Sequence, residues 1–299
     1  MKVAVAGANG LIGSNLVRAL RARGDEVVPL VRNPRRTDEV RWDPRAGAEW
    51  TRALDGVDGI VNLAGANIGA KRWSEEYKRE IRESRLQATR ALVESMRAAT
   101  RRPRVFVSAS AVGYYGDRGD EEVTESTPPG SDFLAGLCKE WEEEAARAEQ
   151  LGVRTVLLRT GVVLDRKDSA LAKMIPPFKA FVGGPIGSGR QWFPWIHIDD
   201  EVGLILWALD GSVRGPLDAV SPAAVRMKEF ASALGRALGR PAVLPVPAFA
   251  LRLAVGEMAE VLLGGQRALP RKALEGGYRF RFDDLDRALR EVLARPASA

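Results

Sequence analysis

Short apolar runs alternate with longer amphipathic stretches through residues 1–220 of the chain. The apolar runs predict five strands: Val3–Ala6, Val27–Val31, Gly59–Leu63, Val105–Ser108 and Val153–Arg159. Between them, apolar residues recur at helical spacing and predict helices near Leu11–Arg23, Ser74–Ala99 and Asp132–Gln150. Strands without polar alternation are typical of a parallel sheet that is covered on both faces. The pattern therefore predicts an α/β fold with a doubly wound parallel sheet.

After about Leu164 the pattern becomes less regular. Two Gly/Pro-rich stretches, Met174–Phe178 and Val182–Gly189, are expected to shape the mouth of a substrate site. Helical spacing returns in four segments: Asp199–Leu209, Met227–Leu238, Pro245–Leu263 and Leu285–Leu293. We therefore assign residues 1–165, with 199–222 returning to them, to the sheet core. Residues 166–198 and 223–299 are assigned to a smaller C-terminal lobe on the substrate side.

The first predicted strand ends in three glycines at the spacing G-x-x-G-x-x-G, and a helix follows directly. The first glycine permits a tight turn, the second lets a phosphate approach bare backbone, and the third lets helix and strand pack closely. The helix then directs unpaired N–H groups toward a pyrophosphate. This order predicts a Rossmann dinucleotide site, with a tight structural turn as the alternative. The contacts expected here are Gly7, Asn9, Gly10, Leu11, Ile12 and Gly13.

The segment after the second predicted strand bears on the choice of cofactor. An NAD enzyme often carries Asp or Glu there, which holds the ribose 2′-hydroxyl. This chain has Arg32-Asn33-Pro34-Arg35-Arg36 instead. A guanidinium pairs well with a 2′-phosphate, so Arg32 favours NADP(H) over NAD. The alternative is a solvated basic loop in an arginine-rich chain.

Composition narrows the function classes. The net charge is +6, but basic residues are scattered among acidic ones and no nucleic-acid-binding motif is visible, so we expect no nucleic-acid partner. No apolar run is long enough to span a bilayer, so no membrane partner is expected. Cys138 is the only cysteine and His197 the only histidine, which excludes an internal disulfide and argues against a metal site of the usual zinc ligands. We expect a cytoplasmic protein.

Three further motifs stand out. Asn62-Leu63-Ala64-Gly65 and the segment Ser108–Gly116 lie at the ends of predicted strands, and the third is Pro194-Trp195-Ile196-His197-Ile198-Asp199-Asp200. With the glycine turn, they resemble the extended short-chain dehydrogenases/reductases, and more narrowly the nucleoside-diphosphate-sugar epimerase-related branch. Residues 245–299 resemble the small domain of unknown function that closes this branch. The resemblance implies an NADP(H)-binding epimerase or oxidoreductase that acts on a small polar substrate, with a sugar nucleotide as a candidate.

The resemblance also implies roles for individual residues. Ser110 matches the active-site Ser/Thr position, where a hydroxyl donates to a substrate oxygen that gains negative charge; capping of a strand end is the alternative. Tyr114 and Tyr115 are candidates for proton transfer, or else they line the wall of the site. The remaining cofactor contacts implied are Leu63, Ala64, Gly65, Ser108, Arg159, Thr160 and Gly161.

The third predicted helix departs from the family pattern. Active members carry Tyr-x-x-x-Lys there, in which the Tyr transfers a proton and the Lys lowers its pKa and holds the nicotinamide ribose. Counting back four residues from Lys139 reaches Ala135. If Glu142 marks the register instead, Leu134 and Cys138 take the two places. Either register lacks the dyad and with it a general acid typically worth about 10²–10⁴ in rate.

Four residues are expected on the substrate side: Arg72, Trp73, Arg190 and His197. Arg190 suits a phosphate or carboxylate. His197 suits proton transfer near neutral pH, although a lone histidine in an apolar run is more often structural. Turnover without the dyad and a catalytically silent NADP(H) sensor or regulator both stay open. The long helices beside the sheet resemble those that pair in dimeric relatives, so a homodimer is a candidate assembly.

Overall fold

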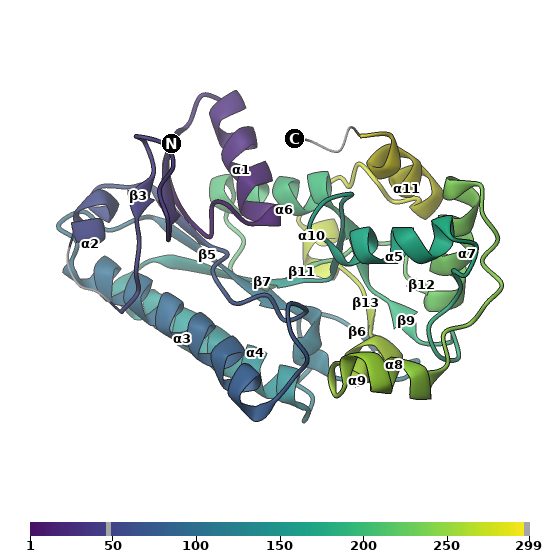
Figure 1. Ribbon diagram of the computed structural model, residues 1–299. Coiled ribbons are helices and arrows are strands. Elements are labelled where there is room, and N and C mark those ends of the chain that lie inside the picture. The colour runs from purple at the N-terminus through teal and green to yellow at the C-terminus, as the bar shows by residue number, and fades with distance from the viewer. Residues whose placement is uncertain (46–48, 296–299) are drawn as a thin grey trace.

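A seven-stranded parallel sheet forms the centre of the computed structural model, which describes residues 1–45 and 49–295 (Figure 1). In spatial order its strands are β3 (Val40–Arg41), β2 (Glu26–Val31), β1 (Lys2–Ala6), β4 (Gly59–Asn62), β5 (Val105–Ala111), β7 (Arg154–Thr160) and β11 (Gly215–Ala219). The order reverses between β1 and β4. In sheets of this kind, ligands bind at the carboxyl ends of the strands beside such a reversal.

Helices cover both faces of this sheet, which confirms the predicted doubly wound α/β fold (Figure 1). One face carries α1 (Leu11–Ala22) and α6 (Ile198–Asp210). The other face carries α2 (Glu49–Leu54), α3 (Glu75–Ala98) and α4 (Phe133–Ala146). Capping side chains fix where two of them begin, because Ser74 accepts from the Tyr77 amide and Asp132 from the Ala135 amide.

The sequence pattern does not predict the edge strand β11. Its sequence, Gly-Pro-Leu-Asp-Ala, contains Pro216, which cannot donate a hydrogen bond to a neighbouring strand. The proline is tolerated because β11 pairs on one side only, with β7. This strand places Asp218 in the interior of the protein.

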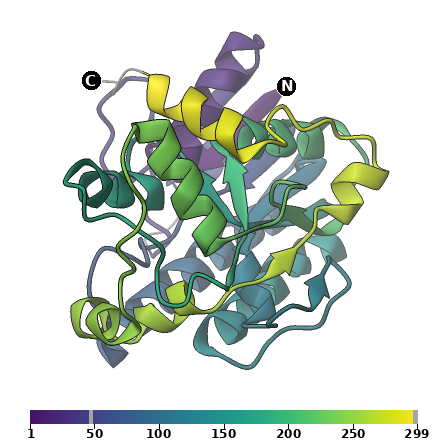
Figure 2. The ribbon, with the colours of Figure 1, turned by 90° about the vertical axis from the view of Figure 1, so that its right-hand side faces the viewer.

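A smaller lobe lies against one end of the core (Figure 2). Its apolar centre joins α5 (Ala170–Lys179), α7 (Met227–Leu238) and α11 (Leu285–Ala294). Three short strand pairs add to it or tie it to the core: β8 (Val162–Leu164) with β10 (Trp195–His197), β9 (Trp192–Phe193) with β12 (Val225–Arg226), and β6 (Glu122–Val123) with β13 (Arg267–Ala268). The remaining helical segments are η1 (Val112–Tyr115), η2 (Arg147–Leu151), α8 (Ala248–Val255), α9 (Met258–Leu263) and α10 (Arg271–Glu275). None of the helices in the described ranges is long and apolar enough to cross a membrane.

Two segments correct the sequence-based prediction. The helix expected over Pro245–Leu263 is divided into α8 and α9 at Gly256, whose φ is +65° and where a Cβ would lie 2.7 Å from Nε of Arg72. The Met174–Phe178 stretch is helical and lies within α5, although it contains two prolines. Burial of apolar side chains such as Ile175 and Phe178 in the lobe core offsets the hydrogen bonds that the prolines cannot make.

Candidate functional site

The glycine turn joins β1 to α1 and leaves the start of the helix bare. Two of its glycines are required by packing: a Cβ on Gly7, whose φ is +80°, would lie 2.8 Å from the Leu63 carbonyl oxygen, and one on Gly13 would lie 2.2 Å from the Gly7 carbonyl oxygen. Gly10 differs, because it is exposed and a Cβ there would approach only the Gly7 carbonyl oxygen, at 3.3 Å. Gly10 is also the N-cap of α1, and no side chain among the described residues caps the helix there. Its amides therefore remain available to an anion, as a pyrophosphate site requires.

A hollow of about 400 Å³ opens beside this turn. It is lined by Ala8, Asn9, Ser14, Val17, Arg18, Arg21, Pro29, Arg36 and Glu39. Arg21 pairs with Asp38, whereas Arg18 and Arg36 form no ion pair within the described ranges. Arg32 is exposed directly after β2 and is not among the lining residues, so the basic segment contributes Arg36 to the hollow instead. The sequence analysis did not single out Arg18 or Arg36.

The segment after β4 is fixed by a buried asparagine. Asn62 donates from Nδ2 to Thr89 Oγ1 at 2.9 Å, and its Oδ1 accepts from the Ala64 amide at 3.2 Å. Leu63 and Ala64 are half-buried there, and Gly65 is exposed. These three residues thus lie at the carboxyl end of β4, directly beside the glycine turn, as the Gly7–Leu63 approach shows.

The serines of β5 are enclosed by protein. Ser108 is fully buried, and Ser110 is only 4% exposed. Ser110 donates from Oγ to Glu142 Oε1 at 2.6 Å. The same carboxylate accepts two hydrogen bonds of 2.8 Å from the Arg159 guanidinium, one on each oxygen. The hydroxyl expected to face substrate is therefore already committed to Glu142, which corrects the prediction for Ser110.

The two tyrosines of η1 occupy different environments. Tyr115 is fully buried, donates to Asp218 Oδ1 at 2.7 Å and accepts from Arg159 Nη1 at 3.0 Å. Burial and the neighbouring Asp218 charge raise the pKa of Tyr115 well above its usual range, so the phenol stays protonated inside the protein. Because Tyr115 is buried and stays protonated, the structure corrects the prediction that it transfers a proton to or from substrate. Tyr114 is half-buried, and its ring centroid lies 3.5 Å from Cζ of Arg159.

On α4, residues four apart face the end of β5. Leu134 lies against Gly113, the buried Cys138 lies near Ser110, and Glu142 accepts from Ser110. Burial raises the pKa of the Cys138 thiol to about 12, with the Glu142 charge as a further cause. Lys139 is exposed and reaches Glu143 at 3.9 Å. Leu134, Cys138 and Glu142 thus share the inner face of α4, whereas Lys139 lies on its exposed face.

The loop after β7 is bonded to α6 through Thr160 and Glu201. The Arg159 side chain points into the interior, and only the backbone of this segment remains for a cofactor contact. Thr160 donates from Oγ1 to Glu201 Oε1 at 2.8 Å, while Glu201 Oε2 has no partner in the described part of the chain. Burial raises the pKa of Glu201 to about 8. Gly161 packs tightly, because a Cβ there would lie 2.5 Å from the Pro194 carbonyl oxygen.

The sequence analysis did not identify three buried carboxylates that bond predicted site residues: Glu142, Asp218 and Glu201. Their partners lie 17, 103 and 41 positions away along the chain. The one usable signal was Glu142, which marked the family register on α4. No local pattern flags the other two.

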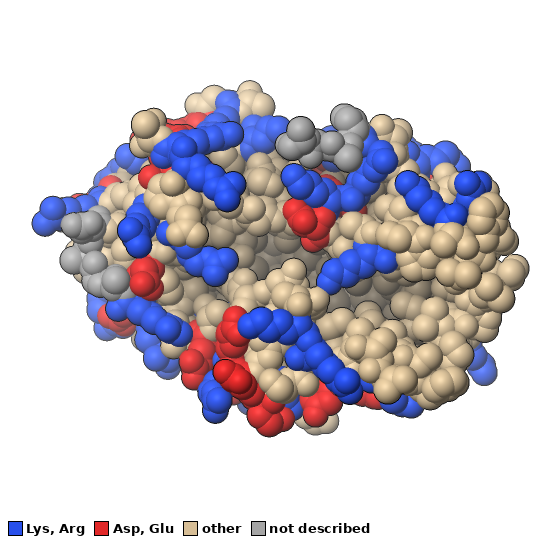
Figure 3. Space-filling model, in the orientation of Figure 1, with Lys and Arg blue, Asp and Glu red and all other residues tan. Residues whose placement is uncertain are grey.

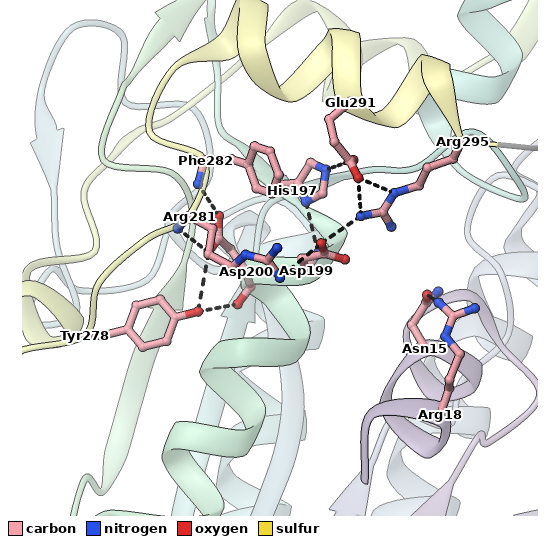
Figure 4. Close-up of polar contacts among 10 residues, drawn as sticks. All are labelled: Asn15, Arg18, His197, Asp199, Asp200, Tyr278, Arg281, Phe282, Glu291 and Arg295. Carbon is pink, nitrogen blue, oxygen red and sulfur yellow. Dashed lines mark hydrogen bonds and ion pairs between the residues drawn. The ribbon is translucent and has the colours of Figure 1, made fainter. Parts of the chain in front are cut away.

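His197 lies where β10, α6 and the C-terminal helix α11 meet (Figure 4). Its Nδ1 accepts from the Asp199 amide at 3.1 Å, so Nε2 carries the proton and donates to Glu291 at 2.8 Å. The ring stacks on Phe282 with centroids 3.7 Å apart. His197 is fully buried, which corrects its predicted place on the substrate side. Both ring nitrogens of His197 instead make hydrogen bonds within the protein.

The other substrate-side candidates remain near the surface. Trp73 packs edge-on against Phe133 and donates to the Ile68 carbonyl at 2.8 Å. Arg72 is exposed and lies against Gly256, at the junction of α8 and α9. Arg190 is exposed in the loop that precedes β9.

The space-filling view shows a hollow between the core and the lobe, with Lys and Arg side chains on both sides of it (Figure 3). Helix α3 and the segment after β4 each contact the C-terminal part of the chain through a lysine. Lys78 of α3 pairs with Glu257 at 2.8 Å, and Lys173 of α5 donates to the Gly69 carbonyl at 2.8 Å. These two contacts join the core to the lobe.

Comparison with known proteins agrees with this geometry. The sequence matches the NAD dependent epimerase/dehydratase family over residues 3–218 and a domain of unknown function, DUF1731, over residues 246–292. The epimerase family protein ML0860 of Mycobacterium leprae (strain TN) is 42% identical over 298 residues, which are 99% of this chain and 96% of that protein.

Two solved structures are also similar. The human epimerase family protein SDR39U1 (isoform 2), solved with NADPH, has a TM-score of 0.91 at 38% identity and covers 98% of this chain and 99% of its own. The nucleoside-diphosphate sugar epimerase from Corynebacterium glutamicum has a TM-score of 0.79 at 34% identity, over 98% of this chain and 58% of its own. The chain therefore belongs to the NAD dependent epimerase/dehydratase family, in its atypical branch of extended short-chain dehydrogenases/reductases that includes SDR39U1.

Proposed function

We propose that this chain binds NADP(H). The observation that carries the proposal is the bare glycine turn with an arginine-lined hollow beside it. Gly10 leaves the first amides of α1 open to a pyrophosphate. Arg18 and Arg36 line the hollow without an ion-pair partner in the described ranges, and an unpaired guanidinium suits the 2′-phosphate. The human relative solved with NADPH supports the same choice of cofactor.

The proposed activity is that of an NADP(H)-dependent oxidoreductase or epimerase acting on a small polar substrate, with nucleotide sugars as the first candidates. The bound cofactor supplies hydride transfer. Tyr114 is the proposed proton carrier, because its hydroxyl makes no hydrogen bond within the described ranges whereas Ser110 and Tyr115 are bonded inside the protein. The Arg159 guanidinium stacked on its ring fixes the position of Tyr114. Arg72, Trp73 and Arg190 remain proposed substrate contacts.

A second candidate function is NADP(H) binding without turnover, as in a sensor or regulator. The observation that supports it is the α4 face, where Leu134 lies against Gly113 and Cys138 is buried; in the register marked by Glu142, these two residues would take the places of the family's Tyr and Lys. Neither side chain transfers a proton at neutral pH, since Leu134 is aliphatic and the Cys138 pKa is about 12.

One series of assays distinguishes the two proposed functions. Purified protein with NADPH is offered a panel of carbonyl compounds, followed by absorbance, and of nucleotide sugars, followed by chromatography of the products. We expect turnover of at least one compound, and a loss of about 10²–10⁴ in kcat in Tyr114→Phe with NADPH affinity unchanged. NADPH binding with no turnover across the panel supports the silent function. Absence of NADPH binding contradicts both.

A further inference from the structure

The side chain of Arg85, on α3, lies between helix α4 and the segment that follows β4. Its Nη1 donates to the Ala66 and Ile81 carbonyl oxygens, each at 3.0 Å. Its Cζ lies 5.2 Å from the Trp141 ring centroid. A Cβ on Gly65 would lie 3.1 Å from its Cγ and Cζ, so Gly65 rests directly on this side chain.

The charge of Arg85 has no carboxylate to balance it. Within residues 1–45 and 49–295, Arg85 forms no ion pair, and its Nε and Nη2 make no hydrogen bond. The groups close enough to act on its charge are the Cys138 thiol and the Tyr77 phenol. Cys138 is neutral near pH 7 because its pKa is about 12. Burial lowers the pKa of Arg85, as expected for a cation that is partly removed from water with no carboxylate beside it in the described ranges.

A partly buried cation without a charged partner is costly, and a ligand that brings hydrogen-bond acceptors to it would offset that cost. The surroundings of Arg85 indicate which ligand that is. It underlies Gly65, a proposed cofactor contact, and it lies near Cys138, which takes the place of the family's lysine on α4. Cys138 in turn lies near Ser110 at the end of β5. Arg85 thus brings a positive charge from α3 to the region where α4 lacks one.

We propose that Arg85 binds the nicotinamide half of NADP(H), donating from Nε and Nη2 to its ribose oxygens and so replacing the missing lysine of α4. The inference rests on the proposed function, since it assumes that NADP(H) is the ligand. It assigns Arg85 a binding role from a different helix than the one that carries the family dyad. Because the guanidinium stays charged throughout the physiological range, this role involves holding the ribose and no proton transfer.

The test compares two ligands on four proteins by calorimetry. NADPH carries both halves of the cofactor, whereas 2′,5′-ADP carries only the adenosine half with its 2′-phosphate. The proteins are the wild type, Arg85→Met, Arg85→Lys and the control Arg79→Met, which removes an exposed arginine of the same helix. For Arg85→Met we expect NADPH binding about 10- to 100-fold weaker, 2′,5′-ADP binding within about twofold of wild type, and an intermediate loss for Arg85→Lys. Arg79→Met should match the wild type with both ligands.

Unchanged NADPH affinity in Arg85→Met overturns the inference and leaves the proposed function standing. A parallel loss of both ligands also overturns it, because it marks a structural role for Arg85. If Arg85→Met does not fold, Arg85→Lys provides the test, because it keeps the charge but loses the forked donors. Weaker NADPH binding with normal 2′,5′-ADP binding in Arg85→Lys supports the inference. Normal NADPH binding in Arg85→Lys contradicts it. If the wild type binds neither ligand, the proposed function itself fails.

Discussion

Gly10 and Gly13 belong to one motif but serve different physical purposes, and substitutions separate them. A Cβ at Gly13 collides with backbone, whereas a Cβ at Gly10, whose φ is an ordinary −76°, would approach only the Gly7 carbonyl oxygen, at 3.3 Å. We expect Gly13→Ala to cost about 3 kcal/mol of unfolding free energy or more, at the upper end of overpacking effects. Gly10→Val should keep near-normal stability and lose NADPH binding. Urea unfolding with NADPH titration checks both; retained NADPH affinity in Gly10→Val would mean that phosphate does not approach this residue.

Glu201 gives the folded protein an unusual dependence on pH. Its carboxyl has a pKa near 8 when folded and near 4.5 in the unfolded chain. The folded state therefore binds more protons between these values, and its stability decreases as pH rises from about 4.5 to about 8. In Glu201→Gln this contribution is absent, so the variant should gain stability over the wild type as pH rises through that window. Melting temperatures across the window test this, and parallel curves for the two proteins would refute it.

At the scale of elements, the attachment of α11 depends on a neutral histidine. His197 caps α6 through Nδ1 and binds Glu291 of α11 through Nε2, so protonation of Nδ1 removes the cap. Burial lowers the pKa of His197 below its ordinary value of 6.5, more than the Glu291 contact raises it. The stability it contributes is complete above about pH 6.5 and is lost as pH falls through the lower folded pKa.

We therefore expect acidification below about pH 6.5 to lower the melting temperature of the wild type more than that of His197→Asn, whose amide can still cap α6 without titrating in this range. Protection of the α11 amides from hydrogen exchange, taken relative to the intrinsic rate at each pH, should fall over the same interval in the wild type. An identical acid response in the two proteins would show that His197 is not the group responsible.

Elements with a strong local signal were predictable from the sequence. The helix α1 follows from the glycine turn and its apolar spacing, and α3 begins directly after Ser74 because that serine caps it. The division between α8 and α9 was not predictable, since the apolar pattern continues through Gly256 and the break depends on a contact with Arg72. The edge strand β11 escaped for a similar reason, because its proline is tolerated only at the edge of a sheet.

The candidate site was predictable where backbone alone makes it. The glycine turn could be derived from spacing and the residues after β4 from a family resemblance, because both roles depend on small residues at strand ends. The side-chain roles of Ser110, Tyr115 and His197 could not, since each depends on a carboxylate far away in the sequence that engages it. Exposure of a polar side chain is decided by tertiary packing, which a motif does not encode.

At the scale of the whole molecule, the choice of cofactor depends on charge at the hollow beside α1. Arg18 and Arg36 come from different elements and converge on it without carboxylate partners in the described ranges. We expect Arg18→Met combined with Arg36→Met to weaken NADPH binding at least about tenfold while changing NADH binding little, since each charge-assisted hydrogen bond is worth roughly 1.5–3 kcal/mol. Equal losses for both cofactors would place these arginines outside the 2′-phosphate site. Fluorescence titration of the two cofactors measures the ratio.

The central claim is that the turn after β1 and the hollow beside it form an NADP(H) site. Calorimetric titration of the wild-type protein with NADPH and, separately, with NADH tests it most directly. The account predicts binding of NADPH at one site per chain, at least about tenfold tighter than NADH, which corresponds to about 1.4 kcal/mol or more. No heat with either cofactor, or equal affinity for the two, would contradict it.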